Sequence, residues 1–210
     1  MTDYRLTYFD IDGGRAEPIR IALHAGGIPF DDHRIAIQEF IETRDRYPFK
    51  CIPVLEIDGQ PVTQSTAIAK YVGTLAGLYP SDALQALYCD EVMGAIEDVT
   101  QHLGRTIRLE GDELKKAREA LVEGWFPVYL SGLARLLQRG GGEYFADNRL
   151  TIADLSVFVM TSWLQSGFLD HVPTDLVEKT APALATHHAR IAADPKVIAY
   201  YQARQTAGGR

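Results

Sequence analysis

The fold is decided by the stretch IPVLEIDGQPVTQSTAIAKY, which spans residues 52–71. Residues 54–57 are a short apolar run opened by a proline, and the Asp-Gly pair that follows is the strongest two-residue hairpin signal in the chain. The return strand over residues 60–63 should lie at a sheet edge, because Pro61 has no N–H to donate to a neighbouring strand. The pattern then predicts an amphipathic helix with Ser65 as its N-cap.

Two positions in this stretch could bind a ligand. An Ile-Pro bond can be cis at small cost, and a cis Pro53 at the strand start would turn the N–H and C=O of Ile52 outward, towards an extended ligand. Gln64 and Ser65 stand where a helix begins, and free N–H donors and the helix dipole favour an anionic group there. Together these features suit a short peptide with a free carboxylate. A plain hairpin with an ordinary helix cap explains the same residues equally well.

Composition limits the classes of function. The 210 residues are 46% hydrophobic and 23% charged, which is typical of a globular protein. A net charge of −7 argues against a nucleic-acid partner, since phosphate binding needs a basic face. The sequence has no apolar run long enough to predict a membrane span and no signal-peptide pattern at its start. Two cysteines, Cys51 and Cys89, do not make a disulfide framework, so we expect a cytoplasmic, reduced protein.

The order of predicted elements indicates an α+β N-terminal domain. Strands are predicted at residues 4–9 and 30–35, with helices at residues 18–26 and 38–46. With the hairpin and its helix, the order becomes β-α-β-α-β-β-α over residues 1–77. This order is that of a thioredoxin-like domain, whose parallel strand pair takes a right-handed crossover.

Beyond a linker at residues 77–80, every predicted element is helical. Residues 82–204 are therefore expected to form an all-helical domain, followed by a flexible tail over residues 205–210. The first long helix should carry one apolar stripe, made of Leu84, Leu87, Tyr88, Val92, Ile96, Val99 and Leu103.

The remaining helices are predicted from the same periodicity. A second long helix over residues 114–138 should be kinked by Pro127. Residues 150–164 are apolar almost all round, which predicts the buried central helix of the domain. Thr151 and Asp154 are spaced as a capping box in front of that helix. Two shorter helices, at residues 182–193 and 195–204, close the chain.

The chain resembles cytosolic glutathione transferases. Residues 52–59 followed by Gln-Ser-x-Ala-Ile-Ala-x-Tyr at residues 64–71 are similar to the glutathione-binding half of that family. The opening Tyr-Arg-Leu-Thr-Tyr-Phe (residues 4–9), Gly-Arg-Ala-Glu (residues 14–17) and Asp-His-Arg-Ile (residues 32–35) resemble the sigma class, which includes the haematopoietic prostaglandin D synthases. The resemblance covers nearly all of the chain. It implies a homodimeric detoxification enzyme that adds glutathione, its co-substrate, to hydrophobic electrophiles.

The resemblance makes Tyr8 the catalytic residue. Tyr8 would donate its O–H to the glutathione sulfur, and such a hydrogen bond lowers the pKa of the thiol from its ordinary value of about 8.5. Arg15 would support the site as a second catalytic residue. The family usually has one residue fewer between this tyrosine and arginine, so the loop over residues 10–14 is longer here. Without the resemblance, a tyrosine at a strand end more often indicates half-buried packing.

The resemblance also implies a glutathione-binding set, in which several residues depart from the class. Phe40 and Arg44 stand where the class has a tryptophan and a lysine for the glycyl end. Arg44 can still bind a carboxylate, although it could equally be a solvated charge, and Phe40 cannot donate the indole hydrogen bond. Cys51 replaces a glutamine or lysine, either as an inert substitution or as a partner for a mixed disulfide. The full set is Tyr8, Phe40, Arg44, Lys50, Cys51, Ile52, Pro53, Gln64, Ser65 and Asp98.

Four positions on the first long helix define the remaining expectations. The resemblance makes Asp98 the acid that reaches across a dimer to the glutamyl amine of glutathione. Gly94 and Glu97 occupy two places of the aspartate cluster that binds a divalent metal in some sigma members, so no metal site is predicted. Arg105 stands where the prostaglandin synthases carry a tryptophan, so that activity is not predicted. The electrophile pocket is expected to be lined by the loop after Tyr8 and by side chains of the long helices near residues 101–105, and no motif names its substrate.

Two other functions remain open. One is a glutathione peroxidase that acts on lipid hydroperoxides. The other is a non-catalytic, crystallin-like protein that binds glutathione or a hydrophobic ligand. Tyr8 argues for an enzyme, whereas Phe40, Cys51 and the longer loop leave the crystallin-like alternative open. A thioredoxin-like redox protein is disfavoured, because the chain has no C-x-x-C motif.

Overall fold

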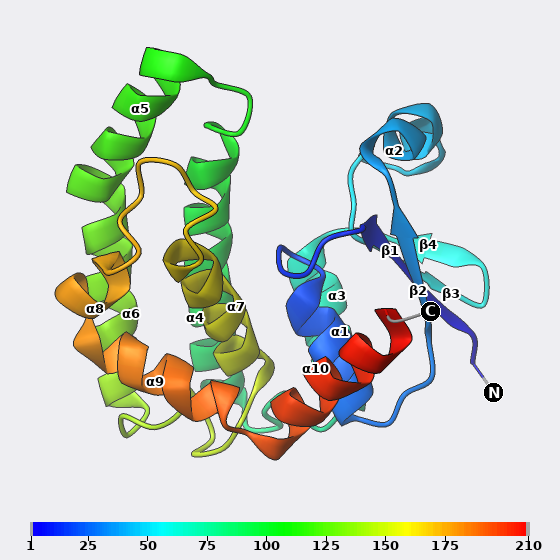
Figure 1. The fold of residues 1–210 in the computed structure, drawn as a ribbon. Coiled ribbons are helices and arrows are strands. Elements are labelled where there is room, and N and C mark those ends of the chain that lie inside the picture. Colours follow the sequence, from blue (N-terminus) through cyan, green and yellow to red (C-terminus); the bar gives the residue numbers. More distant parts are fainter. Residues whose placement is uncertain (1, 209–210) are drawn as a thin grey trace. The chain divides into compact units, whose positions relative to one another are not determined.

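The computed structural model describes residues 2–208, with side chains described up to residue 206. Contacts divide the chain into two compact units. The sheet unit comprises the chain up to Tyr79 together with the segment from Pro195 onward, and the helical unit is Pro80–Asp194. Figure 1 shows the elements of each unit. Among the described residues, no helix has the length and apolar character needed to cross a bilayer.

The sheet has four strands, β1 (Tyr4–Phe9), β2 (Asp31–Ile35), β3 (Val54–Ile57) and β4 (Gln60–Val62), in the order β2-β1-β3-β4. The β1–β2 pair is parallel and the other pairs are antiparallel, so the predicted thioredoxin-like order is confirmed. Asp58 and Gly59 turn the hairpin with φ of 49° and 79°, the left-handed conformation that an Asp-Gly turn favours. Pro61 lies on the edge strand β4, as predicted.

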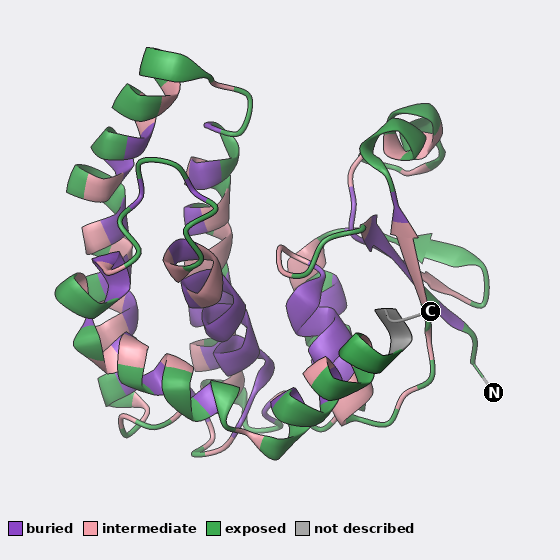
Figure 2. Cartoon of the chain, viewed as in Figure 1, coloured by how far each residue is buried: buried purple, intermediate pink, exposed green. Residues whose placement is uncertain are grey.

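Four helices accompany the sheet: α1 (Glu17–Ala25), α2 (Ile37–Thr43), α3 (Ser65–Leu75) and α10 (Pro195–Gly208). Helix α1 packs against α3 and α10, and its buried face is purple in Figure 2. A 3₁₀ turn, Arg44–Arg46, follows α2. The Ile52–Pro53 peptide is cis, as predicted.

The predicted N-cap of α3 is wrong by one residue. Gln64 holds the N-cap position with φ 73°, and Ser65 is the first residue of the helix. The chain reverses sharply at Gln64 after the short edge strand, so helical geometry begins one residue after the left-handed position. The first N–H groups of α3 still point out of the helix end, which is the property a bound anion needs.

The helical unit is built around α7, whose burial was predicted. Figure 2 shows α7 almost entirely purple, and α7 packs against α4 and α9. The elements of the helical unit are α4 (Ala83–Gly104), α5 (Gly111–Ala120), a π-helical turn η2 (Leu121–Trp125), α6 (Phe126–Arg139), α7 (Ile152–Gln165), α8 (Leu176–Thr180) and α9 (Pro182–Ala192).

The apolar stripe predicted for α4 is partly wrong. Leu84 and Leu87 are 52% and 60% exposed, whereas the buried residues of this helix are Cys89, Val92, Met93, Val99 and Leu103. At ~100° per residue, Leu84 and Leu87 lie roughly 100° and 160° around the helix from Leu103. They are therefore outside the face that packs on α7.

The long helix predicted to kink at Pro127 is irregular just before that residue. The helix is wound as a π turn over Leu121–Trp125, and Pro127 follows as the second residue of α6. The wider turn lies where the ring and the missing N–H of Pro127 disturb regular α-helical bonding. The preceding helix begins at Gly111, earlier than predicted, and α8 was not predicted at all.

The last helix of the chain, α10, differs from its prediction in two ways. Helix α10 groups with the sheet unit, although the sequence assigns residues 195–204 to the helical domain. The helix also continues to Gly208, through part of the expected tail over residues 205–210, and residues 209–210 lie outside the described residues. The functional division into residues 1–77 and 82–204 remains a prediction.

Candidate functional site

Tyr8 lies near the end of β1 with its side chain 7% exposed. The backbone N–H of Arg15 donates to the Tyr8 hydroxyl oxygen at 3.3 Å. Gly14, with φ +67°, lies so close that a Cβ there would be 2.8 Å from the same oxygen. The longer loop therefore still brings Arg15 to Tyr8, through its backbone. An oxygen that accepts a hydrogen bond is polarised so that its own O–H becomes a stronger donor.

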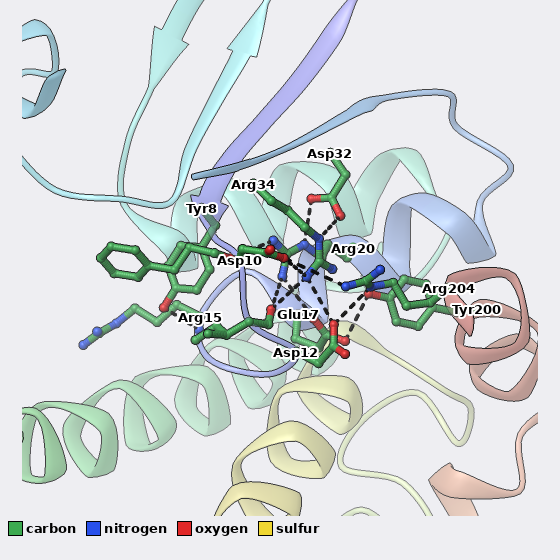
Figure 3. A network of polar contacts seen from close by, with 12 residues as sticks. Tyr8, Asp10, Asp12, Arg15, Glu17, Arg20, Asp32, Arg34, Tyr200 and Arg204 are labelled. Carbon is green, nitrogen blue, oxygen red and sulfur yellow. Dashed lines mark hydrogen bonds and ion pairs between the residues drawn. The ribbon is translucent and has the colours of Figure 1, made fainter. Parts of the chain in front are cut away.

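Arg20 lies beneath this loop and is completely buried. Its guanidinium donates to the carbonyl oxygens of Ile11 at 3.0 Å and Phe9 at 3.4 Å. It also forms ion pairs with Asp32 at 2.8 Å and Glu17 at 3.2 Å. Figure 3 shows Arg20, Glu17 and Asp32 gathered beside Tyr8, whose ring centroid is 5.8 Å from the Arg20 Cζ. Arg20 therefore ties β1, the loop and β2 together.

The buried carboxylate of Glu17 connects the loop to α10. Glu17 accepts the hydroxyl of Tyr200 at 3.0 Å as well as the guanidinium of Arg20. Burial raises the pKa of Glu17, against the opposing effects of Arg20, the Gly13 backbone and Tyr200. Burial also raises the pKa of Tyr200, and the Glu17 charge adds to this shift. Tyr200 therefore remains a neutral donor to this carboxylate.

Arg34 holds the outer side of the loop. Its Nη1 donates to the Ile11 carbonyl at 3.1 Å and to Asp12 at 3.2 Å, and its Nε pairs with Asp32 at 2.7 Å. Although burial alone would lower the pKa of Arg34, the hydrogen bond with Asp32 raises it. Asp12 also accepts the Nε of Arg204 at 3.1 Å. In Figure 3 the Arg15 side chain extends away from these acidic residues.

Strand topology brings most of the predicted glutathione-binding residues to one end of the sheet. Thr7 pairs with Val54 in the antiparallel register, so Ile52 and Pro53 lie beside the end of β1 that carries Tyr8. Strand β4 ends at the same side, which brings Gln64 and Ser65 there. Strand β2 runs parallel to β1, so α2 also begins at this end.

The side chains from α2 to Cys51 are more exposed. Phe40 packs edge-on against Phe9, with ring centroids 5.5 Å apart. Arg44 lies exposed in the 3₁₀ turn. Lys50 forms an exposed ion pair with Asp45 at 2.7 Å. Cys51 is a half-buried free thiol, and Cys89 is fully buried in α4.

Asp98 belongs to the helical unit and is exposed on α4. The hydroxyl of Tyr129 donates to its carboxylate at 3.1 Å. Burial, with the adjacent Asp98 charge, raises the pKa of Tyr129. Within residues 2–208, no group of three or more His, Cys, Asp or Glu side chains is arranged to hold a metal ion.

The contacts of Glu17, Arg20, Tyr200 and Arg204 around the loop were not predicted from the sequence. A signal for the first two was present, because Glu17 and Arg20 are charged positions in a helix whose neighbours are otherwise apolar. Charged residues are almost never fully buried unless they are paired. Tyr200 and Arg204 gave no such signal, since Tyr200 meets Glu17 across 183 positions of sequence.

Comparison with known proteins identifies the family. The model of the glutathione S-transferase N-terminal domain matches residues 4–74, and that of the C-terminal domain matches residues 97–204. Glutathione S-transferase 3 of Caenorhabditis elegans is 33% identical over 162 residues, covering 75% of this chain and 78% of the relative. Hematopoietic prostaglandin D synthase of Gallus gallus is 30% identical over 204 residues, covering 97% and 98%.

Solved structures agree on the fold and represent more than one class. Prostaglandin synthase D of Nilaparvata lugens aligns with a TM-score of 0.84 at 28% identity, over 95% of this chain and 97% of that one. The Pi-class glutathione S-transferase of Onchocerca volvulus aligns with a TM-score of 0.80 at 27% identity, over 98% and 95%. The predicted fold, a thioredoxin-like domain with a helical domain, is confirmed, and the chain belongs to the glutathione S-transferase family.

Proposed function

We propose that this protein is a sigma-type glutathione transferase that adds the thiolate of glutathione to hydrophobic electrophiles. The observation that carries the proposal is Tyr8, whose hydroxyl accepts the Arg15 N–H at 3.3 Å at the sheet end that also holds Ile52, Pro53 and the start of α3. A polarised hydroxyl beside an extended backbone and a helix N-terminus suits a thiol-bearing peptide.

Tyr8 lowers the pKa of the bound thiol. The thiol releases its proton to solvent, and the Tyr8 O–H donates a hydrogen bond to the thiolate that remains. The sulfur then forms a bond to the electrophilic carbon of the second substrate. With an aryl halide, the carbon–halogen bond breaks and the halide departs with its electron pair. Arg15 adds positive charge near this centre.

The peptide backbone of glutathione is bound by the chain's own backbone. The N–H and C=O of Ile52, placed by Pro53, pair with the cysteinyl residue as a neighbouring strand would. The first N–H groups of α3, with Gln64 and Ser65, bind the γ-glutamyl carboxylate. Asp98 of a second copy in a homodimer binds the glutamyl amine.

The glycyl end is held more loosely. Arg44 binds the glycyl carboxylate, and Lys50 adds positive charge nearby. Phe40 contributes packing alone, and Cys51 is an inert neighbour of the site. The domain division gives glutathione binding to residues 1–77 and electrophile binding to residues 82–204, near residues 101–105. We place the enzyme in the cytoplasm, where reduced glutathione is available.

A paired assay of turnover and binding tests the proposal. The purified protein should conjugate glutathione to a chlorinated nitrobenzene and should bind glutathione in calorimetry. Binding without turnover would favour the crystallin-like alternative. Faster turnover of an organic hydroperoxide than of the aryl halide would favour the peroxidase. Light scattering checks the dimer, and a fluorescent fusion checks the location.

A further inference from the structure

A chain of buried polar contacts runs from α10 to the loop beside Tyr8 (Figure 3). Tyr200, 5% exposed, donates its hydroxyl to Glu17 at 3.0 Å. The Glu17 carboxylate in turn accepts a hydrogen bond from the backbone of Gly13. The Glu17 N–H also donates to the Gly14 carbonyl at 3.4 Å. Two successive hydrogen bonds, which meet at Glu17, therefore connect α10 to the glycine pair beside Tyr8.

A second connection reaches the same loop from its outer side. Arg204 donates its Nε to Asp12 at 3.1 Å, and Arg34 donates to the same carboxylate oxygen at 3.2 Å. Asp12 is thus held once from β2 and once from α10. We call Tyr200 and Arg204 together the α10 clamp.

We propose that Tyr200 and Arg204 are positioning residues, which hold the loop so that the Arg15 N–H stays directed at the Tyr8 hydroxyl. The inference rests on the proposed catalytic role of Tyr8. It adds that the last helix of the chain, far from Tyr8 in sequence, fixes the geometry of that hydroxyl.

The loop needs such external support because of its own sequence. Gly13 and Gly14 have φ of +103° and +67°, and two successive glycines have more backbone freedom to lose than any other pair. Gly14 must also remain without a side chain, since a Cβ would meet the Tyr8 oxygen at 2.8 Å. The sequence that permits this close approach therefore cannot stiffen the loop, and contacts from neighbouring elements must do so.

The clamp and Arg20 hold different parts of the loop, although both contact Glu17. Arg20 fixes the carbonyl groups of Phe9 and Ile11, where the loop leaves β1. Glu17 and Asp12 hold the following half, and each of them has a donor from α10. Removing the donors of Tyr200 and Arg204 should leave the half of the loop held by Arg20 in place. It should loosen the other half, which ends at Arg15.

The test uses the full-length protein with ¹³Cζ-labelled tyrosine. The Tyr8 resonance is assigned by its loss in Tyr8→Phe, and it reports the hydroxyl environment without any glutathione. Three variants are compared with the wild type: Tyr200→Phe, Arg204→Gln and the double variant. Arg5→Gln is the matched control, because the Arg5–Asp31 ion pair joins β1 to β2, is half exposed and does not involve the loop.

We expect the Tyr8 resonance to shift and broaden in the two single variants, most strongly in the double variant, and to stay unchanged in Arg5→Gln. With glutathione bound, the double variant should reduce kcat at neutral pH by roughly 3- to 10-fold, with KM for glutathione unchanged and activity recovered at higher pH. Arg204→Lys, which keeps the charge beside Asp12, should retain most of the activity.

A Tyr8 resonance and a kcat–pH profile that both stay at their wild-type values in folded Arg204→Gln and Tyr200→Phe would overturn the proposal. Lower stability with an unchanged Tyr8 resonance would also overturn it and make α10 purely structural. If Tyr200→Phe does not fold, Arg204→Gln decides, since Arg204 is partly exposed. A shifted Tyr8 resonance in a protein that never turns over glutathione would support the clamp and refute the proposed function instead.

Discussion

Glu17 in the sheet unit and Asp154 in the helical unit are both fully buried carboxylates, yet they stabilise different kinds of structure. Asp154 accepts the N–H and hydroxyl of Thr151 at 2.8 and 2.7 Å, the Phe145 N–H at 3.0 Å and the His187 ring at 2.9 Å. All of these donors belong to packed segments around the start of α7. Asp154 therefore fixes the start of α7, as the predicted capping box does. Its contact with His187 also joins α7 to α9.

Glu17 accepts donors of another kind. Beside Arg20, its partners are the backbone of a glycine loop and two tyrosines of the last helix, Tyr200 and Tyr201. A buried carboxylate needs several donors in either setting, because an unpaired buried charge is strongly destabilising. The same requirement therefore stabilises the start of α7 in one unit and the loop beside Tyr8 in the other.

The largest expected effect is on the stability of the helical unit. Asp154→Ala removes the acceptor of four hydrogen bonds and leaves buried donors at Thr151, Phe145 and His187 unpaired. We expect a loss of about 3–5 kcal/mol in the free energy of unfolding, measured by urea denaturation. Asp175→Ala is the control, since it breaks an exposed ion pair with Lys179 and should leave the midpoint nearly unchanged. Equal midpoints for the two variants would contradict this role of Asp154.

Tyr8→Phe should have the opposite signature, with folding preserved and chemistry impaired. The ring keeps its packing while the hydroxyl is lost, so thermal stability and glutathione affinity should stay near wild type. Turnover at neutral pH should fall roughly 10- to 100-fold and should climb again at higher pH. Steady-state kinetics against pH measures this. A variant that loses stability and keeps its turnover would make Tyr8 a core residue like those around Asp154.

Asp98→Ala tests whether the helical unit also contributes to glutathione binding. Loss of a charge-assisted hydrogen bond to the glutamyl amine should raise the half-saturating glutathione concentration roughly 5- to 50-fold, or about 1–2 kcal/mol. Tyr129→Phe, which removes the donor to Asp98, should give a smaller increase. Full activity in a protein that is monomeric in solution would contradict a glutathione site completed by Asp98 of a second copy.

The smallest effect is expected at Cys51. Cys51→Ala should retain most of the turnover, because the backbone of Ile52 makes the proposed pairing with glutathione. A loss of more than tenfold in a folded variant would assign chemistry to Cys51 and revive a redox function. Cys89 is the internal comparison: burial raises its pKa to about 12, so a thiol reagent at pH 8 should label Cys51 and leave Cys89 protonated and unreactive until the protein unfolds.

Local sequence patterns predicted most of the fold. The Asp-Gly turn, the edge position of Pro61 and the burial of α7 each follow from a few neighbouring residues, and the structure has all three. The predictions differ from the structure where contacts between distant segments determine burial or packing. Leu84 and Leu87 match the helical period of α4 but fall outside the face that α7 covers. The place of α10 depends on a buried tyrosine and glutamate that no local pattern connects.

The candidate site was predictable to a similar extent. Strand register brings Tyr8, Ile52 and Gln64 to one end of the sheet, and the sequence indicated each position. The sequence could not show how Arg15 reaches Tyr8, since that contact is made by a backbone N–H at the end of a glycine loop. The charges that hold this loop come from three separate elements, so they were recognised only in the structure.

The thiolate absorbance of bound glutathione, titrated against pH in the wild type and in Tyr8→Phe, tests the central claim most directly. If the Tyr8 hydroxyl stabilises the thiolate, the wild-type titration should lie about two pH units below that of the variant, a difference of about 2.7 kcal/mol. Bound glutathione would then be mostly thiolate at neutral pH in the wild type alone. Titrations that coincide would contradict the account and leave Tyr8, like the residues around Asp154, a part of the packing.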